Sequence, residues 1–383
     1  MKYDFIVVGA TGQQGRISSI DLLKNGYSVL LCGRNKERVE HILNNFKKTD
    51  FVYLDLRNYK DIVKTIKQSG ARILLNCAEG DWNLQVLKAC VETKINSIDL
   101  GSEIWMTKKQ LEMDNLLKKV GIVHITGCGS VPGIGNVMLN HVSNEFDTIK
   151  TIEVGFSWNS NIKEFVIPFS MESITEEFTE PATNVKNGRF IKIRPMDSLE
   201  ENKNKLVGKE ERFYVRHPET YTFYKYYKHK GIENVKFYAG FPIHSFKMID
   251  AIIKLGLGSK KEIDFQGMKI RPIDFTTKVL KELPMPKGYK EKEDLWVKIY
   301  GKKNKKSKKI LMQCVVNTLD NWEFAGCNID TGMPASIIAQ MIFRGEIQGK
   351  GSFAPEAIVP TKLFFKELSK RKMFVYQNGR KIN

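Results

Sequence analysis

The chain opens with Phe5-Ile6-Val7-Val8-Gly9-Ala10-Thr11-Gly12-Gln13-Gln14-Gly15, a short apolar run that leads directly into a glycine-rich turn. Residues 17–25 then carry apolar side chains at helical spacing, and Gly26 follows them. A strand, a glycine turn and a helix start are together typical of a dinucleotide-binding element. Glycine lets the backbone approach a pyrophosphate, and the helix N-terminus attracts it. The spacing is G-x-x-G-x-x-G, a variant of the commoner G-x-G-x-x-G.

The end of the next apolar stretch, 27–32, indicates which dinucleotide binds. A site that selects NAD usually has Asp or Glu there to hold the ribose 2′-OH. This chain instead has Cys32 and Gly33, followed by Arg34. The planar fork of arginine pairs well with phosphate oxygens, so Arg34 suits a 2′-phosphate. We therefore predict NADP(H) rather than NAD(H); the alternative is a solvated Arg34 at a helix start.

Strand-like and helix-like segments alternate as far as residue 126. The strand-like segments are 51–54, 72–77, 97–100 and 122–126, and the helical ones are 36–46, 59–68, 83–93 and 108–120. This alternation predicts an α/β Rossmann domain, a doubly wound parallel sheet that binds ligands at the carboxyl ends of its strands. The candidate cofactor-binding residues at those ends are Gly9, Thr11, Gly12, Gln13, Gln14, Gly15, Arg34, Asn35, Asp55, Leu56, Cys77 and Ala78.

After residue 150 the apolar pattern changes to a period of two. It predicts a second, α+β domain on a mostly antiparallel sheet, with strands at 151–158, 190–194, 236–239, 269–270, 295–300 and 311–316. Helical patterns at 246–255 and 272–282 interrupt them. A helix over 335–343, with Pro334 before it and Gly345 after it, is expected to pack back on the first domain. The predicted domains are 1–130 for dinucleotide binding, completed by 331–383, and 131–330 for substrate binding and dimerisation.

The composition excludes several other classes of protein. The net charge is +18, but lysine is spread along the chain, and the densest run, 302–309, is interpreted as a solvated hairpin loop rather than a nucleic-acid contact. No apolar run is long enough to cross a bilayer and no leader is recognisable, so we expect a cytoplasmic protein without membrane contact. The six cysteines form no C-x-x-C pair, which predicts reduced thiols and no metal site.

Residues 127–136, Gly-Cys-Gly-Ser-Val-Pro-Gly-Ile-Gly-Asn, resemble the G-C-G-x-x-P-G-x-x-N/H segment of the saccharopine dehydrogenase family, the NADP-linked, glutamate-forming kind. The glycine turn with residues 33–35, the stretch 86–101 and the stretch 331–356 are similar to other motifs of that family. Carboxynorspermidine dehydrogenases share this layout, so the resemblance indicates the family rather than a substrate. One position departs: many amino-acid-forming members have Asp before the Pro-Gly, where this chain has Val131.

The resemblance implies a homodimeric NADP(H)-dependent oxidoreductase of amino-acid metabolism. It would transfer hydride at a C–N centre of an amino-acid-like or polyamine-like substrate. The alternative is a non-catalytic NADP(H)-binding regulator that retains the fold, which Val131 favours. Candidate catalytic residues are His217 as proton donor, Glu103 and Cys128. Candidate substrate-binding residues are Gly129, Ser130, Pro132, Gly133, Asn136 and Arg189. Arg189 would bind a substrate carboxylate, and Arg194 and Arg212 are the alternatives for that role. A structural role is the other interpretation of each: a surface His217, a helix-start Glu103, an inert Cys128 thiol and a helix-capping Asn136.

Overall fold

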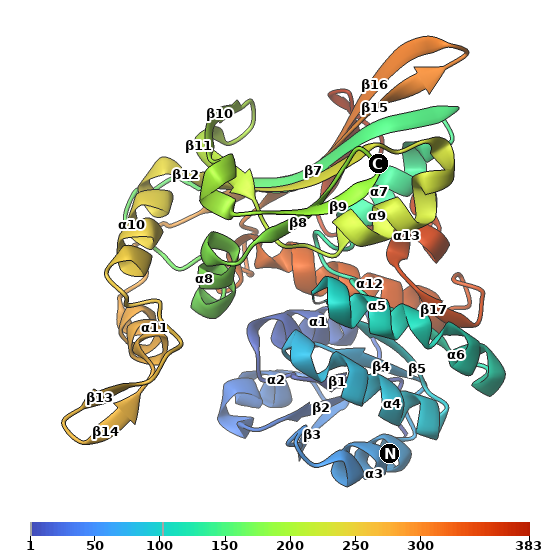
Figure 1. The fold of residues 1–383 in the computed structure, drawn as a ribbon. Coiled ribbons are helices and arrows are strands. Elements are labelled where there is room, and N and C mark those ends of the chain that lie inside the picture. The colour runs from blue at the N-terminus through green and yellow to red at the C-terminus, as the bar shows by residue number, and fades with distance from the viewer. Residues whose placement is uncertain (1, 102) are drawn as a thin grey trace.

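The first of two large sheets has seven strands, all parallel, in the order β17-β6-β5-β4-β1-β2-β3 (Figure 1). The computed structural model describes residues 2–101 and 103–383 of the chain. The strands are β1 Phe5–Val8, β2 Val29–Gly33, β3 Thr49–Tyr53, β4 Ile73–Asn76, β5 Asn96–Asp99, β6 Val123–Ile125 and β17 Gly351–Phe353. Read from one edge, β3-β2-β1-β4-β5-β6 is the order of a Rossmann sheet, so the predicted fold is confirmed.

Helices cover both faces of this sheet, which explains why its strands are almost continuously apolar. In β1, Phe5 and Val7 belong to one core and Ile6 and Val8 to another, and all four side chains are buried. The helices between the strands are α1 Gln13–Lys24, α2 Glu40–Asn45, α3 Tyr59–Ser69, α4 Asn83–Thr93, α5 Ile104–Glu112 and α6 Asp114–Val120.

Two predicted helices of this domain are divided in the structure. The segment 36–46 begins as a 3-10 turn, η1 Lys36–Val39, before α2. The segment 108–120 is interrupted at Met113 between α5 and α6. At that interruption the Asp114 carboxylate accepts hydrogen bonds from Ser352 N in β17 (3.0 Å) and from Lys118 Nζ (2.6 Å). The division therefore lets α6 hold the last strand of the sheet.

The second sheet has ten strands and is antiparallel except between β12 and β7, so the predicted mostly antiparallel α+β domain is confirmed. Its main path runs β10-β11-β12-β7-β15-β16-β18-β19, with β8 on β12 and β9 on β8. The strands are β7 Thr148–Ser160, β8 Ala182–Lys186, β9 Arg189–Ile193, β10 Glu200–Asn204, β11 Gly208–Tyr214, β12 Asn234–Pro242, β15 Glu291–Lys303, β16 Lys306–Asn317, β18 Phe374–Gln377 and β19 Arg380–Lys381. Helices α7 Ile134–Ser143, α8 Met171–Thr179, α9 Glu219–Tyr227, α13 Pro355–Ile358 and α14 Thr361–Lys370 accompany it.

The lysine-rich run at 302–309 is indeed part of a hairpin, but its loop is much shorter than predicted. Strands β15 and β16 continue to Lys303 and Lys306, and only Asn304 and Lys305 form the turn. Both turn residues have positive φ, 50° and 64°. A two-residue turn of this kind matches the twist of the flanking strands, which is why pairing extends into the basic run.

Helix α12 Ile329–Phe343 begins at Ile329 rather than at residue 335, and Pro334 lies inside it. A Cβ atom on Gly332 would lie 2.6 Å from Ile17 Cγ2, and Ser18 Oγ donates to Gly332 O (2.8 Å), so α12 crosses α1 at very close range. The rest of the tail divides between the two sheets. Strand β17 joins the first sheet, whereas β18 and β19 extend the second.

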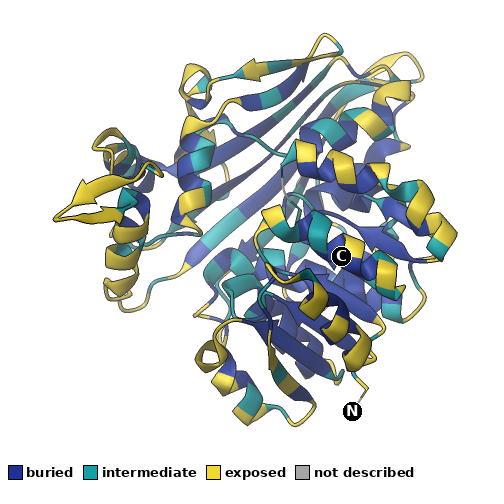
Figure 2. Cartoon of the chain, turned by 60° about the horizontal axis from the view of Figure 1, so that its bottom comes forward, coloured by how far each residue is buried: buried dark blue, intermediate teal, exposed yellow. Residues whose placement is uncertain are grey.

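An arm projects from the end of the second sheet, and we call residues 243–285 the arm. It consists of α10 Ile243–Lys254, the hairpin of β13 Ile263–Phe265 and β14 Met268–Ile270, and α11 Pro272–Glu282. Figure 2 shows it as a mainly exposed extension beside the buried sheets. Within the described ranges, no helix combines the length and the apolar character that a membrane span requires.

Candidate active site

The glycine turn brings three strand ends of the first sheet together. Gly9 has a φ of +74°, and a Cβ there would lie 2.6 Å from Ala78 N at the end of β4. On the other side, Ala10 N donates to Cys32 O at the end of β2 (3.0 Å). Gly15 faces back onto the turn, where a Cβ would be 2.3 Å from Gly9 O. Any larger residue at either glycine would push the turn away from these neighbours.

This turn has the features of a phosphate-binding site. Gly12 is the N-cap of α1 and no side chain caps the helix. The Arg16 N–H is the donor to Gly12 O (3.1 Å), so the N–H groups of Gln13 and Gln14 come before the intrahelical ladder. Uncapped N–H groups and the positive end of the helix dipole favour a pyrophosphate here. The turn therefore fits the diphosphate of a dinucleotide.

The ends of β2 and β3 carry an arginine where an NAD site has a carboxylate. Arg34 is exposed and, within the described part of the chain, forms no salt bridge. Asp55 follows β3 and is held by Arg57; those hydrogen bonds, with a smaller effect of the Arg34 charge, lower the Asp55 pKa to about 2. Asp55 is thus already engaged, and Arg34 is the group left for a 2′-phosphate. These residues fit NADP(H).

Asp99, at the end of β5, fixes the next strand ends and the loop that follows β6. Its Oδ1 accepts from Gly101 N (2.8 Å), Thr126 Oγ1 (2.8 Å) and Gly127 N (3.1 Å), and Gln110 Nε2 donates to its Oδ2 (2.5 Å). Its backbone oxygen accepts from Cys128 N (2.8 Å). The side chain is buried, and it satisfies donors that would otherwise be left unpaired.

The loop over 127–133 is tightly closed on itself before it enters α7. Gly133 has a φ of +137°, and a Cβ there would lie 1.9 Å from Gly129 O, so a side chain is excluded. Asn136 Oδ1 accepts from Gly133 N (2.8 Å), while its Nδ2 donates to Glu356 Oε2 (2.7 Å). Asn136 therefore holds the loop in shape. Ser130 and Val131, at the tip, face the space between the two domains.

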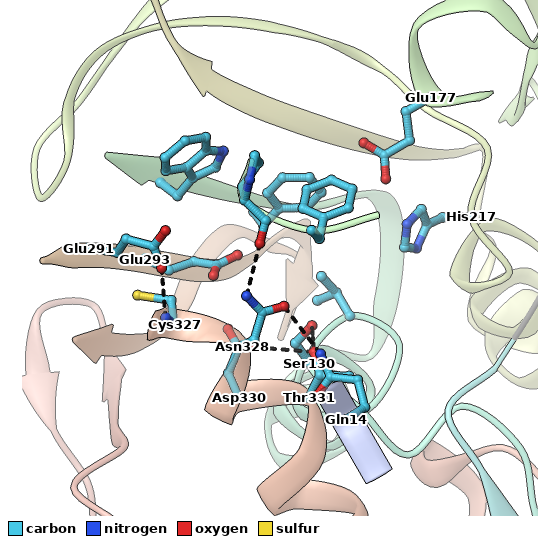
Figure 3. A pocket seen from close by; sticks show the side chains of 15 residues that line it. Gln14, Ser130, Glu177, His217, Glu291, Glu293, Cys327, Asn328, Asp330 and Thr331 are labelled. Atoms are coloured by element: carbon cyan, nitrogen blue, oxygen red, sulfur yellow. Dashed lines mark hydrogen bonds between the residues drawn. The ribbon is translucent and has the colours of Figure 1, made fainter. Parts of the chain in front are cut away.

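A cavity of about 200 Å³ lies at that junction (Figure 3). Both domains contribute to its wall, and Gln14 of the glycine turn reaches it and donates to Asn328 Oδ1 (3.2 Å). The lining residues are Gln14, Ser130, Val131, Phe156, Trp158, Pro168, Phe169, Glu177, His217, Glu291, Glu293, Cys327, Asn328, Asp330 and Thr331. The cavity therefore adjoins the cofactor-binding turn, as a substrate site must.

His217 lines the cavity and is held from two sides. Its Nδ1 is 3.1 Å from Glu219 Oε2, and its ring stacks on Phe237 with centroids 3.8 Å apart and planes 10° apart. Since Nδ1 is engaged, Nε2 is the nitrogen that can exchange a proton with a ligand. Glu177 lies nearby in Figure 3; burial raises its pKa to about 7, although the positive charge of His217 opposes that rise.

The opposite end of the cavity is lined by carboxyl groups. Glu291 is already hydrogen-bonded, by Cys327 N (2.8 Å) and Tyr289 OH (2.9 Å). Asp330 accepts from Thr331 Oγ1 (3.1 Å), but its buried Oδ2 has no partner. Burial and the neighbouring Asp330 together raise the pKa of Glu293 well above its ordinary value. No lysine or arginine is among the described residues that line the cavity.

The structure places Gln14, Ser130 and His217 in this cavity, whereas the candidates Glu103, Cys128 and Arg189 lie elsewhere. Glu103 pairs with Arg216 Nη2 (2.9 Å). Cys128 is fully buried, its thiol donates to Ile125 O (3.3 Å), and burial raises its pKa well above the ordinary value. Arg189 is exposed on β9.

The other two arginines considered as a carboxylate clamp are also absent from the lining. Arg194 precedes a 3-10 turn, and Arg212 pairs with Glu200 Oε1 (2.8 Å). Gly129, Pro132 and Gly133 belong to the closed loop behind Ser130. Asn35, Leu56 and Cys77 lie with the other cofactor candidates at the strand ends of the first sheet.

Sequence reasoning missed the carboxyl groups of the cavity. For Glu291 and Glu293 a signal existed, because they continue the alternation of Leu295 and Val297 toward the start of the same strand. Asp330 directly precedes a motif that had been recognised, but the helix was expected to begin after it. Glu177 lies on α8, a helix that the sequence pattern did not predict.

Three comparisons bear on this site. The saccharopine dehydrogenase NADP binding domain matches residues 5–125, and the saccharopine dehydrogenase C-terminal domain matches 129–373. The carboxyaminopropylagmatine dehydrogenase of Synechocystis is 22% identical over 93% of this chain and 92% of its own. The carboxynorspermidine synthase of Vibrio cholerae is 22% identical over 87% and 84%. The fold is that of the L-Glu-forming saccharopine dehydrogenase of Saccharomyces cerevisiae, with a TM-score of 0.77 over the whole of both chains at 12% identity.

Proposed function

Because the chain belongs to the saccharopine dehydrogenase family, in which it is an NADP(H)-dependent oxidoreductase acting on CH–NH groups, we propose that its substrate is polyamine-like. The observation that carries the proposal is the junction cavity, which touches the cofactor turn through Gln14 and is otherwise rich in carboxyl groups. A substrate with several carboxylates, as an amino diacid has, would meet like charges there. A cationic amine would meet opposite ones. The names of the two relatives agree with this choice.

The cofactor supplies or accepts the hydride, and the residues of this chain hold it and prepare the substrate. We assign the diphosphate to the N–H groups of Gln13 and Gln14, and the 2′-phosphate to Arg34. Gln14 then lies between cofactor and substrate, because its amide also lines the cavity. The side chains of Phe156 and Trp158 exclude water from that space, which keeps a C–N double bond from hydrolysis.

We assign the proton transfer to His217. A C–N centre gains or loses a proton together with the hydride, so a group of suitable geometry must lie at the cavity. His217 is positioned by Glu219, which fixes the ring orientation. Glu103 and Cys128 lie outside the cavity lining, and we propose no direct contact between them and the substrate.

The test begins with fluorescence titration by NADPH and NADH, followed by NADPH oxidation with pairs of aldehydes and diamines. We expect preferential NADPH binding, and turnover with diamines rather than with amino diacids. Arg34→Ala should weaken NADPH binding about 10-fold or more and leave NADH binding nearly unchanged. Equal losses for both cofactors would contradict the 2′-phosphate role, and NADPH binding without turnover in any pair would contradict the enzymatic assignment.

His217→Gln tests the proton donor separately. We expect a loss of about 10²- to 10⁴-fold in kcat with unchanged NADPH affinity. His141→Gln is the matched control, since His141 is half-buried on α7, beside Thr361, and lies outside the cavity. Equal activity of the two variants would contradict the role of His217.

We propose that the chain forms a homodimer through the second domain, with the arm in the interface. Ten of the nineteen exposed large apolar side chains of the described residues lie on or beside it, Met248, Leu255, Leu257, Ile263, Phe265, Met268, Phe275, Val279, Leu283 and Met285. A soluble monomer rarely exposes so much apolar surface in one place. Sedimentation of wild type and of Phe275→Glu tests this: a dimer should dissociate, whereas Phe190→Glu, away from the arm, should not. A monomeric wild type would contradict the proposal.

We also propose a cytoplasmic location, where NADPH is available and thiols stay reduced. All six cysteines are free, and five of them are buried. Fractionation of the cells that make the protein tests this.

A further inference from the structure

We propose that Glu293 and Asp330 form a subsite for a cationic end of the substrate, an alkylammonium or guanidinium group, and that this group displaces a proton held between the two carboxyl groups. The inference deepens the proposed function and depends on it, because the reacting C–N group must then lie at the other end of the cavity, near Gln14 and His217. It predicts a change in proton binding that ordinary ion pairing at a surface would not produce.

The first argument is the convergence of two elements on one point. In β15, Leu295 and Val297 face the core of the domain. Glu293, two residues before Leu295, lies on the same face of the strand. Asp330 lies in the first turn of α12 and points toward it from the other side (Figure 3). A strand and a helix that are separate in sequence therefore present two carboxyl groups to the same part of the cavity.

The second argument is a missing donor. Asp330 is 2% exposed, its Oδ1 accepts from Thr331, and its Oδ2 accepts from no N–H or hydroxyl group of the described residues. Buried carboxyl oxygens are nearly always satisfied, and an unpaired one calls for a donor that the chain does not provide. Two facing carboxyl groups without a cation can be accommodated only if they share a proton. Burial raises the pKa of both groups, and the neighbouring Asp330 adds to the rise at Glu293.

Among the described residues that line the cavity, the pair has no lysine or arginine as a neighbour. On the same strand, Glu291 is held by Cys327 N and Tyr289 OH, and Asp294 is held by Asn204 and Gln313. Toward Asp330 lie the thiols of Cys314 and Cys327, whose pKa burial raises well above the ordinary value, so both are neutral.

Across the cavity lie Glu177 and His217, at the end assigned to the reacting group. A ligand with one positive charge and several N–H donors supplies what Glu293 and Asp330 lack.

The aromatic part of the cavity wall favours a hydrocarbon spacer. Phe156, Trp158 and Phe169 line the same cavity as His217 and the carboxyl pair. Methylene groups gain free energy on leaving water for such a wall, and an ammonium or guanidinium group is also attracted to aromatic faces. The ligand class is therefore a short alkyl chain with a cation at the end remote from the C–N centre.

The proton balance of the binding step is simple. Before binding, the pair carries one proton and one negative charge. The cation enters, each carboxylate accepts N–H hydrogen bonds, and the shared proton passes to the solvent. The complex then holds two negative charges and the ligand cation, so binding releases up to one proton and strengthens as the pH rises.

Titration calorimetry of the full chain saturated with NADP⁺ tests the inference, with 1,4-diaminobutane as the probe. Runs near pH 6.5 in two buffers of different ionisation enthalpy should differ by the heat of up to one released proton. Affinity should rise at least several-fold between pH 6 and pH 8. With 1,4-butanediol, which has no ammonium group, we expect at least 10-fold weaker binding and no released proton.

Asp330→Asn should weaken 1,4-diaminobutane binding at least 10-fold and abolish the buffer-dependent heat. Glu293→Gln, in β15, should likewise weaken 1,4-diaminobutane binding and abolish the buffer-dependent heat. The two variants lie in different elements, so the test remains possible if one of them does not fold. Asp320→Asn, at an exposed carboxylate, is the matched control and should behave as wild type. Binding without proton release, or unchanged affinity in both variants, would overturn the inference. If NADPH-dependent turnover persists in that case, the proposed function stands.

Discussion

Two aspartates, one in each half of the molecule, are equally buried and have opposite properties. Asp99 is 1% exposed and Asp330 is 2% exposed. Burial by itself raises the pKa of both. For Asp99, hydrogen bonds from His124, Gln110 and Thr126 more than offset this, and its pKa lies below the ordinary value. For Asp330, burial outweighs the hydrogen bonds of Glu293 and Thr331, and its pKa is raised to about 7.

The difference lies in the donors that surround each carboxylate. Asp99 receives backbone and side-chain donors from both adjoining strand ends, so its charge is part of the architecture. Asp330 receives one hydroxyl group and faces an open cavity. Burial alone therefore does not distinguish a structural carboxylate from one that can bind a ligand; the number of donors does. Four predictions test this distinction.

The largest effect is expected for Asp99→Ala. It removes the acceptor of the Gly101 and Gly127 N–H groups and leaves the Thr126 hydroxyl only Gln110 Oε1 (3.0 Å), and each unsatisfied buried group costs about 1–3 kcal/mol. We expect the free energy of unfolding to fall by about 3 kcal/mol or more in urea denaturation followed by tryptophan fluorescence. Asp99→Asn, which keeps one acceptor, should lose less. A loss below about 1 kcal/mol in Asp99→Ala would contradict the structural role that distinguishes Asp99 from Asp330.

Asp330→Asn should stabilise the folded chain, whereas Asp99→Ala destabilises it. In the absence of ligand it removes a buried like-charge contact and introduces an amide that can donate to Glu293. We expect the free energy of unfolding at pH 8 to rise by about 1 kcal/mol. The same urea measurement applies. Destabilisation comparable to that of Asp99→Ala would mean that Asp330 is a structural residue too.

Thr126→Val sharpens the comparison at one hydroxyl group. The change is nearly isosteric and removes a donor that lies within hydrogen-bond distance of both Asp99 Oδ1 and Gln110 Oε1, so we expect a loss of about 1 kcal/mol. Thr107→Val is the matched control, because Thr107 is also buried but its hydroxyl has no partner. That change should be neutral or slightly stabilising. Equal losses in the two variants would show that the Asp99 hydrogen bonds contribute little.

The smallest effect is a pH dependence of stability without ligand. Burial raises the pKa of Glu177 and Glu356 to about 7, and the pKa of Glu293 and Asp330 is raised as well. Between about pH 4.5 and 7 the folded chain therefore binds more protons than the unfolded chain, so stability falls as the pH rises. The lowered pKa of Asp99 has no influence in this window, because that carboxylate is ionised throughout.

Melting temperatures from pH 5.5 to 8 at constant ionic strength measure this. The decline should be shallower in Asp330→Asn and unchanged in Thr126→Val. A melting temperature that rises over this range would contradict the assignment of raised pKa values to the carboxyl groups of the cavity.

The comparison also separates what sequence reasoning could find from what it could not. The glycine turn, Arg34 and the strand ends of the first sheet were predicted because each βα unit is local, so that ten to thirty residues specify where its turn lies. His217 and Ser130 were identified through a family resemblance and do line the cavity. Arg189 was proposed as a clamp from its charge alone, and the structure leaves it exposed on β9.

The carboxyl subsite depended on contacts that no local pattern reports. Glu293 faces the cavity because β15 pairs with β7 along its whole length, which fixes the side-chain alternation up to its first residue. Asp330 faces it because α12 begins at Ile329 and packs on α1 at Gly332. The alternation with Leu295 and Val297 indicates the face of Glu293, but neither the pairing of β15 with β7 nor the crossing of α12 and α1 has a signal within a short window of sequence.

The amino-acid sequence by itself thus determined the Rossmann sheet, its preference for a 2′-phosphate and the antiparallel character of the second domain. These follow from periodicity and from the backbone freedom of a few glycines, which act over short distances along the chain. The tertiary structure decided which charged groups meet in the cavity. Their number of donors, and so their ability to bind a ligand, depends on how a strand and a helix from distant parts of the sequence are packed together.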